Sequence, residues 1–202
     1  MKIIGLTGGS GAGKGETSAI LQKYGIPSVD TDAVYHDLLV TSTALKNELV
    51  AAFGDTILDA SGCVVRKQLA AAVFDGKDSS ARLHTLNAIT HKYIMAKTHE
   101  LVKEFEHAGA RAAVIDAPQL FEAGIEGECD IILGVLADRS LRLARIIERD
   151  GISRVAAEKR LAAQHDDAFY RANCDYILEN IADTAALEQE IRHFLEESGL
   201  GL

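Results

Sequence analysis

A glycine-rich segment near the N-terminus constrains the fold of this chain more than any other feature. The segment, Gly8–Lys14 (GGSGAGK), follows an apolar run over residues 2–7 that predicts a buried strand. Beyond it, side chains at the i, i+3, i+4, i+7 spacing predict one face of a helix: Thr17, Ile20, Leu21 and Tyr24. A glycine-rich turn before a helix lets backbone N–H groups and the positive helix end converge on phosphate oxygens, while Lys14 can reach the β- and γ-phosphates. The pattern therefore predicts a phosphate-binding P-loop rather than a purely structural turn.

The residue after Lys14 departs from the P-loop pattern. The pattern G-x-x-x-x-G-K ends in Ser or Thr, whose hydroxyl binds Mg²⁺, but this chain has Gly15 there. Glu16 and Thr17 point about 100° and about 200° around the helix from Gly15, so neither easily replaces the missing ligand. We therefore expect Mg²⁺ to depend on phosphates, water and another carboxylate.

Two aspartates follow the second predicted strand, in the segment Val29-Asp30-Thr31-Asp32. Ligands of open α/β sheets bind at the carboxyl ends of strands. A carboxylate near the γ-phosphate can accept a hydroxyl proton or hold Mg²⁺ through water, which makes Asp32 a candidate base. Asp32 could instead cap a helix beginning at Ala33. The neighbouring P-loop favours the functional interpretation.

Short apolar runs alternate with helical patterns, which indicates an α/β fold with a mainly parallel sheet of about five strands. The strand candidates after the first are residues 26–30, 111–116, 129–136 and 174–178. Helical spacing between residues 33 and 108 predicts a helical insertion over the sheet; its apolar positions are Leu45, Leu49, Phe53, Leu83, Leu86, Ile94, Leu101 and Phe105. A last helix carries Leu187, Ile191, Phe194 and Leu195 on one stripe, and the tail from Gly199 is expected to fray. With the P-loop, this order indicates a P-loop NTPase fold.

Composition and charge limit the partners. The 202 residues are 48% hydrophobic, which fits one compact domain, and 30 acidic against 21 basic residues argue against nucleic acid or anionic lipid. Anionic ligands would therefore need local basic clusters. No signal peptide or membrane span is recognisable, and Cys63, Cys129 and Cys174 match no metal or disulfide spacing. We expect a cytoplasmic protein with reduced thiols and favour a monomer.

Four arginines lie at spacings of three, three and four residues: Arg139, Arg142, Arg145 and Arg149. On a helix they fall within an arc of about 120°. On a closing lid, such a stripe could neutralise charge on a transferred phosphoryl group. The alternative is a solvated basic face with Asp138 and Glu148 as partners. The P-loop favours the lid.

Taken together, the motifs resemble the dephospho-CoA kinase family from Ile4 to Asn180. The matching segments are Gly5–Gly9, Val29–Asp32, Phe53-Gly54 with Gly62 and Arg66, Leu86–His91, Pro118–Glu122, Arg145, Arg149-Asp150, Gln164, and Cys174-Asp175 through Asn180. The departures are Gly15, Lys92 where the family usually has Pro, and Gln119 where Leu is common. Only Gly15 touches the chemistry directly.

The resemblance implies a three-part molecule and a phosphotransferase reaction. The parts are a nucleotide-binding core of about residues 1–32, 109–138 and 170–202, a helical CoA-binding region of about 33–108, and a lid of about 139–169. The implied enzyme uses ATP and Mg²⁺ to phosphorylate the ribose 3′-hydroxyl of dephospho-CoA, the last step of coenzyme A biosynthesis.

The resemblance also implies roles for individual residues. Catalytic roles go to Lys14, Asp32 and Arg145. ATP binding is assigned to Gly9, Gly11, Ala12, Gly13, Lys14, Gly15, Glu16, Arg145, Arg149 and Asn180. Acceptor binding is assigned to Asp32, Arg66, His91, Leu120 and Phe121. His91 is expected to bind without transferring a proton, whereas Arg66 could be a plain surface charge and Phe121 part of the core.

Two other functions stay open. One is a P-loop kinase for a nucleoside monophosphate or a small metabolite such as shikimate or gluconate, since residues 33–108 would fit the acceptor. The other is a nucleotide-binding protein with impaired catalysis, which Gly15 favours. A GTPase switch is disfavoured because the chain lacks an N-K-x-D segment and Asp116 is followed by Ala-Pro-Gln.

Overall fold

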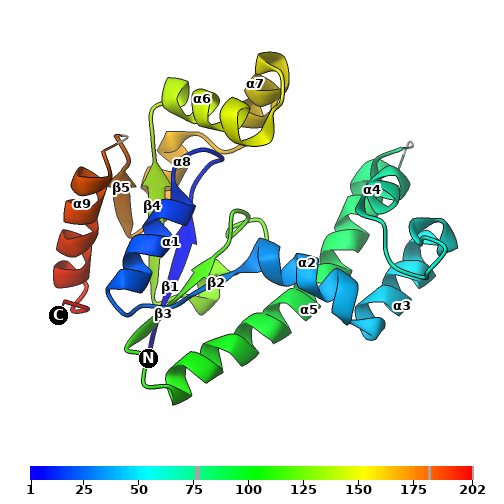
Figure 1. Cartoon of the computed structure of the whole chain (residues 1–202), viewed down its shortest axis with the longest axis horizontal. Coiled ribbons are helices and arrows are strands. Elements are labelled where there is room, and N and C mark those ends of the chain that lie inside the picture. Colours follow the sequence, from blue (N-terminus) through cyan, green and yellow to red (C-terminus); the bar gives the residue numbers. More distant parts are fainter. Residues whose placement is uncertain (76–77, 182, 202) are drawn as a thin grey trace. The chain divides into compact units, whose positions relative to one another are not determined.

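The structure is a computed structural model that describes residues 1–75, 78–181 and 183–201 (Figure 1). The chain divides into two compact units. The first unit comprises Met1–Val29 and Val102–Leu202, and the second comprises Asp30–Leu101. Each unit has its own hydrophobic core, so the two are described separately.

A five-stranded sheet in the order β2-β3-β1-β4-β5 organises the first unit. The strands are β1 (Lys2–Thr7), β2 (Ser28–Asp30, which ends at the first residue of the second unit), β3 (Ala112–Asp116), β4 (Ile131–Leu136) and β5 (Tyr176–Glu179). The pairings of β1 with β3, of β1 with β4 and of β4 with β5 are parallel. The predicted α/β class and five-stranded sheet are confirmed. Because β1 is central, the glycine-rich turn that follows it emerges from the middle of the sheet.

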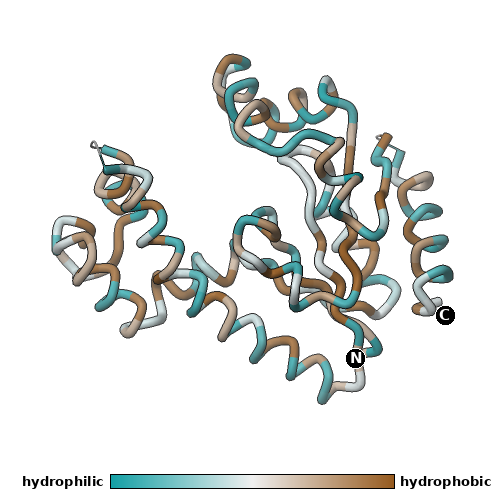
Figure 2. The backbone as a smooth tube through the Cα atoms, turned by 180° about the vertical axis from the view of Figure 1, so that it is seen from behind, coloured by the Kyte–Doolittle hydropathy of each residue, from teal (hydrophilic) through white to brown (hydrophobic). Residues whose placement is uncertain are grey.

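The core of the first unit forms where two helices pack on the sheet. Helix α1 (Lys14–Lys23) contributes the buried Ile20 and Leu21. Helix α9 (Thr184–Glu197) buries the predicted stripe of Leu187, Ile191, Phe194 and Leu195. Figure 2 shows the strands as largely hydrophobic segments, whereas hydrophobic and hydrophilic residues alternate along α9. Burial of one helix stripe against a hydrophobic sheet is what stabilises this layer arrangement.

Two thiols fill space beside glycines of the central strands. A Cβ atom at Gly5 would lie 2.7 Å from the Sγ atom of Cys129, and one at Gly134 would lie 2.8 Å from the Sγ atom of Cys174. Burial raises the pKa of Cys129 to about 12 and that of Cys174 to about 11. All three cysteines are free thiols. The two buried ones act as packing groups, because so high a pKa keeps them protonated and unreactive.

The prediction that the C-terminal tail frays is wrong for the residues described. Gly199 adopts φ 70°, and the N–H of Leu200 donates to the carbonyl of Leu195 at 2.7 Å, which closes a Schellman motif. Leu200 is 4% exposed and belongs to the core, and Arg111 donates to the carbonyl of Gly201 at 2.8 Å. The apolar side chain after the glycine is therefore what anchors the tail.

Three helices complete the first unit: α6 (Arg139–Asp150), α7 (Arg154–Ala162) and α8 (Asp167–Asn173), preceded in the chain by the short η2 (Glu126–Glu128). Helices α6 and α7 share a small core of Ile146, Ala157 and Leu161. Arg149 and Arg160 both bind Asp150, and the hydrogen bond from Arg149 is the main reason why the pKa of Asp150 falls to about 2. This pair of helices thus has its own apolar and ionic contacts.

The second unit is helical, as predicted for residues 33–108. It contains α2 (Thr31–Thr41), α3 (Thr43–Phe53), η1 (Asp55–Ile57), α4 (Arg66–Phe74) and most of α5 (Ser79–His107). Its core is formed by Leu39, Leu45, Leu49, Ile57, Leu69 and Val73. Among the described helices, α5 included, none has the length and apolarity needed to cross a bilayer.

Candidate active site

The glycine-rich segment forms a turn between β1 and α1 that only glycine accommodates at several positions. Gly8, Gly11 and Gly13 have φ values of 142°, 77° and 114°, a region that residues with side chains rarely adopt. A Cβ atom at Gly13 would also lie 2.0 Å from the Nδ2 atom of Asn180. The N-cap of α1 is Gly13 and no side chain caps it, so the first backbone N–H groups of the helix are available to an anion.

Lys14 folds back over this turn. Its Nζ atom donates to the carbonyl of Gly8 at 2.8 Å. The ammonium group therefore lies against the first residue of the loop, where it can interact with phosphates cradled by the same loop.

At Gly15 the structure leaves open space. A Cβ atom built there meets no heavy atom within 4 Å. Neither neighbouring side chain compensates for the absent hydroxyl. Glu16 accepts hydrogen bonds from Thr184 at 2.6 Å and Asn180 at 3.4 Å, and Thr17 donates to the carbonyl of Gly13 at 3.2 Å.

Arg145 and Asn180 reach the loop from two other elements. Arg145, on α6, donates through Nη1 to the carbonyls of Gly11 at 3.1 Å and Ala12 at 3.4 Å. Through Nη2 it donates to the Oδ1 atom of Asn180 at 3.1 Å, and Asn180 is 2% exposed. The structure thus brings these predicted ATP residues to the P-loop.

The four arginines of the predicted stripe have different surroundings. Arg149 is exposed and pairs with Asp150, and Arg139 is exposed at the start of α6. Arg142 is buried, at 6% exposure. Asp138, considered as an ionic partner of the stripe, instead caps α6 by accepting from the N–H of Ser140 at 2.7 Å. That part of the alternative interpretation is wrong.

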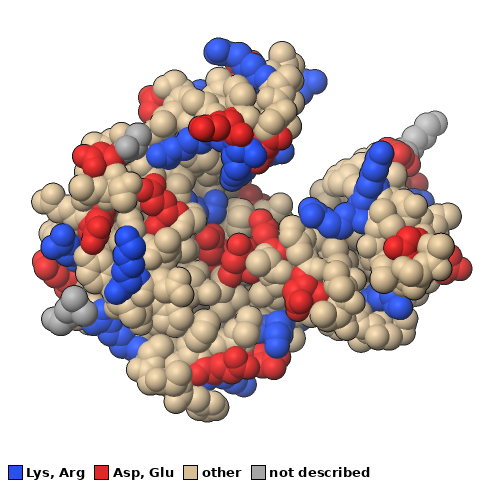
Figure 3. Space-filling model, in the orientation of Figure 1, with Lys and Arg blue, Asp and Glu red and all other residues tan. Residues whose placement is uncertain are grey.

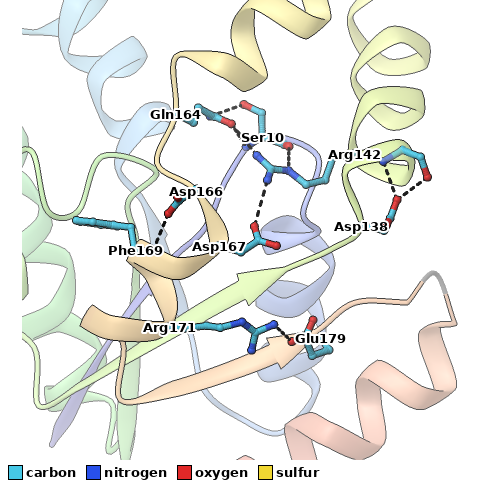
Figure 4. A network of polar contacts seen from close by, with 10 residues as sticks. Ser10, Asp138, Arg142, Gln164, Asp166, Asp167, Phe169, Arg171 and Glu179 are labelled. Carbon is cyan, nitrogen blue, oxygen red and sulfur yellow. Dashed lines mark hydrogen bonds and ion pairs between the residues drawn. The ribbon is translucent and has the colours of Figure 1, made fainter.

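Arg142 and Gln164 are residues that the sequence interpretation left without a role. Both contact Ser10 in the glycine-rich turn (Figure 4). The three-residue spacing between Arg142 and Arg145 is the one sequence signal that could have pointed to a joint role, because it places both on one helix face.

Asp116 is another residue whose position was not anticipated. It ends β3 opposite Leu6 of β1, is 9% exposed, and its Oδ2 atom accepts from the hydroxyl of Ser18 at 3.3 Å. Its place after a buried strand next to β1 was the available signal. The structure thus puts a carboxylate at the carboxyl end of the strand neighbouring the P-loop strand.

Leu120 and Phe121 follow β3 in the same unit. Leu120 is fully buried, with its Cδ1 atom 2.6 Å from where a Cβ of Gly5 would lie. Phe121 is half-buried and meets Phe169 edge to face at a centroid distance of 5.2 Å. His165 stacks on Phe169 at 3.6 Å. Leu120 is thus a core residue, whereas Phe121 belongs to an aromatic cluster that faces partly outward.

The other predicted acceptor residues, Asp32, Arg66 and His91, lie in the second unit. The interpretation of Asp32 as a helix cap is wrong, because α2 begins at Thr31 and its cap is Asp30. Asp30 accepts from the N–H groups of Asp32 at 2.9 Å and Ala33 at 3.0 Å. The carboxylate of Asp32 is left exposed in the first turn.

Arg66 is exposed at the first position of α4, and its charge lies near enough to Tyr35 to oppose the burial that raises the pKa of that phenol. His91 is half-buried on α5, and burial lowers its pKa, which keeps the imidazole neutral near pH 7. The departure at Lys92 is accommodated at the surface, where its ammonium pairs with Glu48 at 2.6 Å.

Positive charge gathers locally despite the net charge of −9. Figure 3 shows Lys and Arg side chains on the part of the first unit formed by α6 and α7. The local basic cluster that anionic ligands would require is therefore present beside the P-loop.

Comparison with known proteins follows this geometry. Residues 2–186 match the family described as CoaE, dephospho-CoA kinase. A dephospho-CoA kinase from Geobacter sulfurreducens is 37% identical over 191 residues, which cover 95% of each chain.

Two solved structures are also similar along the whole chain. A crystal structure from Thermus thermophilus has a TM-score of 0.80 at 30% identity and 97% coverage of both chains. A dephospho-CoA kinase from Campylobacter jejuni has a TM-score of 0.70 at 26% identity and 98% coverage of both chains.

Proposed function

This chain belongs to the dephospho-CoA kinase family, and we propose that it transfers the γ-phosphoryl group of ATP to the ribose 3′-hydroxyl of dephospho-CoA, releasing ADP and CoA. The observation that carries the proposal is the turn Gly8–Lys14, whose glycine conformations and inward-folded lysine suit a nucleotide triphosphate. The ATP site and the lid are assigned to the first unit, and the acceptor region to the second.

Catalysis by this site depends on positioning and charge rather than covalent chemistry. Lys14 would neutralise the β- and γ-phosphates. Arg145, now on the carbonyls of Gly11 and Ala12, lies close enough to follow charge that develops on the transferred group. Asn180 and Arg149 would bind the rest of the nucleotide.

Asp32 is proposed as the base that accepts the proton of the acceptor hydroxyl. Its carboxylate is available for this role because Asp30, and not Asp32, caps α2. Arg66 and His91 would bind the acceptor from the same unit, His91 as a neutral hydrogen-bonding group. Phe121 would offer an aromatic wall, and Leu120 would support that wall from the core.

The residues present also fit Mg²⁺ bound together with the nucleotide. In the described ranges, no three His, Cys, Asp or Glu side chains gather to hold a metal on their own. Kinases hold Mg²⁺ mainly through phosphates and water, with one or two carboxylates. Asp116 in the first unit and Asp32, through water, are candidate ligands, and the open space at Gly15 would admit water where a hydroxyl usually lies. The ion would offset phosphate charge during transfer.

We further propose that the chain acts as a cytoplasmic monomer. Dependence on ATP favours the cytoplasm, and the candidate ATP residues lie within one chain. Light scattering of the purified protein should then give about the chain mass of 21.7 kDa.

The first prediction concerns Lys14 and Asp32. With ATP, Mg²⁺ and dephospho-CoA, the protein should form ADP and CoA in equal amounts. Lys14→Ala and Asp32→Asn should each lower kcat/KM at least ~100-fold, because one removes phosphate charge stabilisation and the other the proton acceptor. Matched controls are Lys23→Ala on the same helix and Asp37→Asn on α2, both at exposed positions, which should retain activity.

The outcomes separate the parts of the proposal. Full activity of Asp32→Asn would show that the base is wrong. ADP formation with shikimate, gluconate or a nucleoside monophosphate, but not with dephospho-CoA, would show that the acceptor is wrong. If the folded protein bound no ATP, the kinase function itself would be contradicted.

A further inference from the structure

All the polar groups of Ser10, which lies inside the glycine-rich turn, are engaged by two side chains from outside the turn. The Ser10 N–H donates to the Oε1 atom of Gln164 at 3.0 Å, and its hydroxyl accepts from the Nε2 atom of Gln164 at 3.1 Å. Its carbonyl accepts from the Nε atom of Arg142 at 3.0 Å. The Nη2 atom of Arg142 donates to the same Oε1 atom of Gln164 at 2.9 Å, which closes a ring of hydrogen bonds (Figure 4).

Burial makes the Arg142 contact hard to replace. Only 8% of this side chain is exposed, and a buried guanidinium is costly unless its donors are paired. Ser10 and Gln164 take two directions of the guanidinium fork, and Asp167 at 3.7 Å faces the third. A Cβ atom at Gly9 would lie 2.0 Å from Nη2, so the guanidinium packs directly on the loop.

Successive arginines on α6 hold successive carbonyls of the loop. Arg142 binds the carbonyl of Ser10, and Arg145, one turn later, binds those of Gly11 and Ala12. In a trans peptide unit the C=O and the N–H that follows it point in opposite directions. The carbonyl of Ser10 therefore faces α6, and the N–H of Gly11 faces away from α6.

We propose that Arg142 and Gln164 are positioning residues of the ATP site. They hold the peptide unit between Ser10 and Gly11 so that the Gly11 N–H faces the phosphates, and they link that orientation to the lid through α6 and the segment after α7. Neither side chain needs to touch the nucleotide. The inference rests on the proposed function, because it requires that the turn binds the phosphates of ATP.

The chemistry of this role separates phosphate binding from the rest of the reaction. A misoriented amide weakens a hydrogen bond made to bound ATP in the ground state as well as in the transition state, so KM for ATP should rise more than kcat falls. One such hydrogen bond is worth about 0.5–1.5 kcal/mol, or roughly 2- to 10-fold in affinity. Ligands without phosphates should be unaffected.

The test compares Arg142→Ala, Arg142→Lys, Gln164→Ala and the double alanine variant. For both single alanine variants, the inhibition constant of ADP and KM for ATP should rise about 5- to 10-fold. The inhibition constant of adenosine and KM for dephospho-CoA should stay within about twofold. Arg142→Lys should fall between wild type and Arg142→Ala, since an ammonium can reach the Ser10 carbonyl but lacks the planar fork for Gln164. The double variant should lose less than the product of the single effects, because both residues act on Ser10.

Matched controls exist on neighbouring elements. Arg154→Ala removes an arginine of α7 that is 75% exposed and bonded to Glu158, and Gln189→Ala removes an exposed glutamine of α9. Both should behave as wild type.

Three results would overturn the inference: ADP inhibition unchanged in both single alanine variants, equal losses for ADP and adenosine, or KM for dephospho-CoA rising as much as KM for ATP. If Arg142→Ala fails to fold, Gln164→Ala decides alone, because it removes a neutral and only half-buried side chain. Wild-type protein that ADP does not inhibit would contradict the proposed function, which is a different outcome from phosphate-insensitive variants of an active enzyme.

Discussion

At the scale of single residues, Gly15 is the clearest departure from the P-loop pattern. The structure shows that its environment does not require glycine, because a Cβ atom there meets no neighbour within 4 Å. Gly13 is the opposite case, with φ 114° and Asn180 directly behind it. Two glycines of one motif thus differ in kind, one required by geometry and the other open to substitution.

We therefore predict that Gly15→Ser leaves kcat/KM equal or raises it. Serine restores a hydroxyl that can bind Mg²⁺ and also forms helices better than glycine by about 0.5 kcal/mol. Gly15→Ala is the matched control, since it brings the helix gain without the hydroxyl. The measurement is kcat/KM as a function of Mg²⁺ concentration. Activity of Gly15→Ser below that of Gly15→Ala would contradict the prediction.

At the scale of elements, helix ends explain several differences between the expected and observed structure. Helix α2 begins two residues earlier than expected, and this shift moves the cap from Asp32 to Asp30. The C-terminal end of α9 is closed by Gly199 and Leu200. Both ends depend on residues just outside the periodic apolar pattern, which periodicity by itself does not report.

The first turn of α2 yields a prediction with two separable readouts. Asp30→Ala should lower the free energy of unfolding by about 1 kcal/mol, because it removes the cap of two N–H groups. Asp32→Asn should lower activity while changing stability by less than about 0.5 kcal/mol. Chemical denaturation and the kinase assay measure the two effects. Stability falling more in Asp32→Asn than in Asp30→Ala would contradict the assignment of the cap.

At the scale of the whole molecule, the chain consists of two compact units with separate cores. The P-loop, Arg142, Arg145 and Asn180 belong to the first unit, so binding of ATP by these residues does not depend on residues 30–101 for its contacts. Nucleotide binding should therefore be measurable without the acceptor.

We predict that ATP alone raises the thermal stability of the protein. A ligand at 100 times its Kd adds about 2.7 kcal/mol to the folded state that binds it. Lys14→Ala should remove most of the increase in Tm, and Lys23→Ala should keep it. Calorimetry over a series of ATP concentrations provides the measurement. An equal increase in Tm for wild type and Lys14→Ala would mean that the nucleotide binds elsewhere.

The sequence by itself determined the features that depend on local pattern: the P-loop between a strand and a helix, the five strands, the helical segment and the buried stripe of α9. Backbone conformation and burial periodicity are written in neighbouring residues, which is why these predictions are confirmed. Only the tertiary structure decided which partner each polar side chain has. Arg142, Arg145 and Arg149 look alike as a stripe, yet the structure gives them Ser10, Gly11 with Ala12, and Asp150 as partners. Those partners lie up to 134 residues away, and hydrogen bonds at such separations depend on how elements pack, which no local pattern specifies.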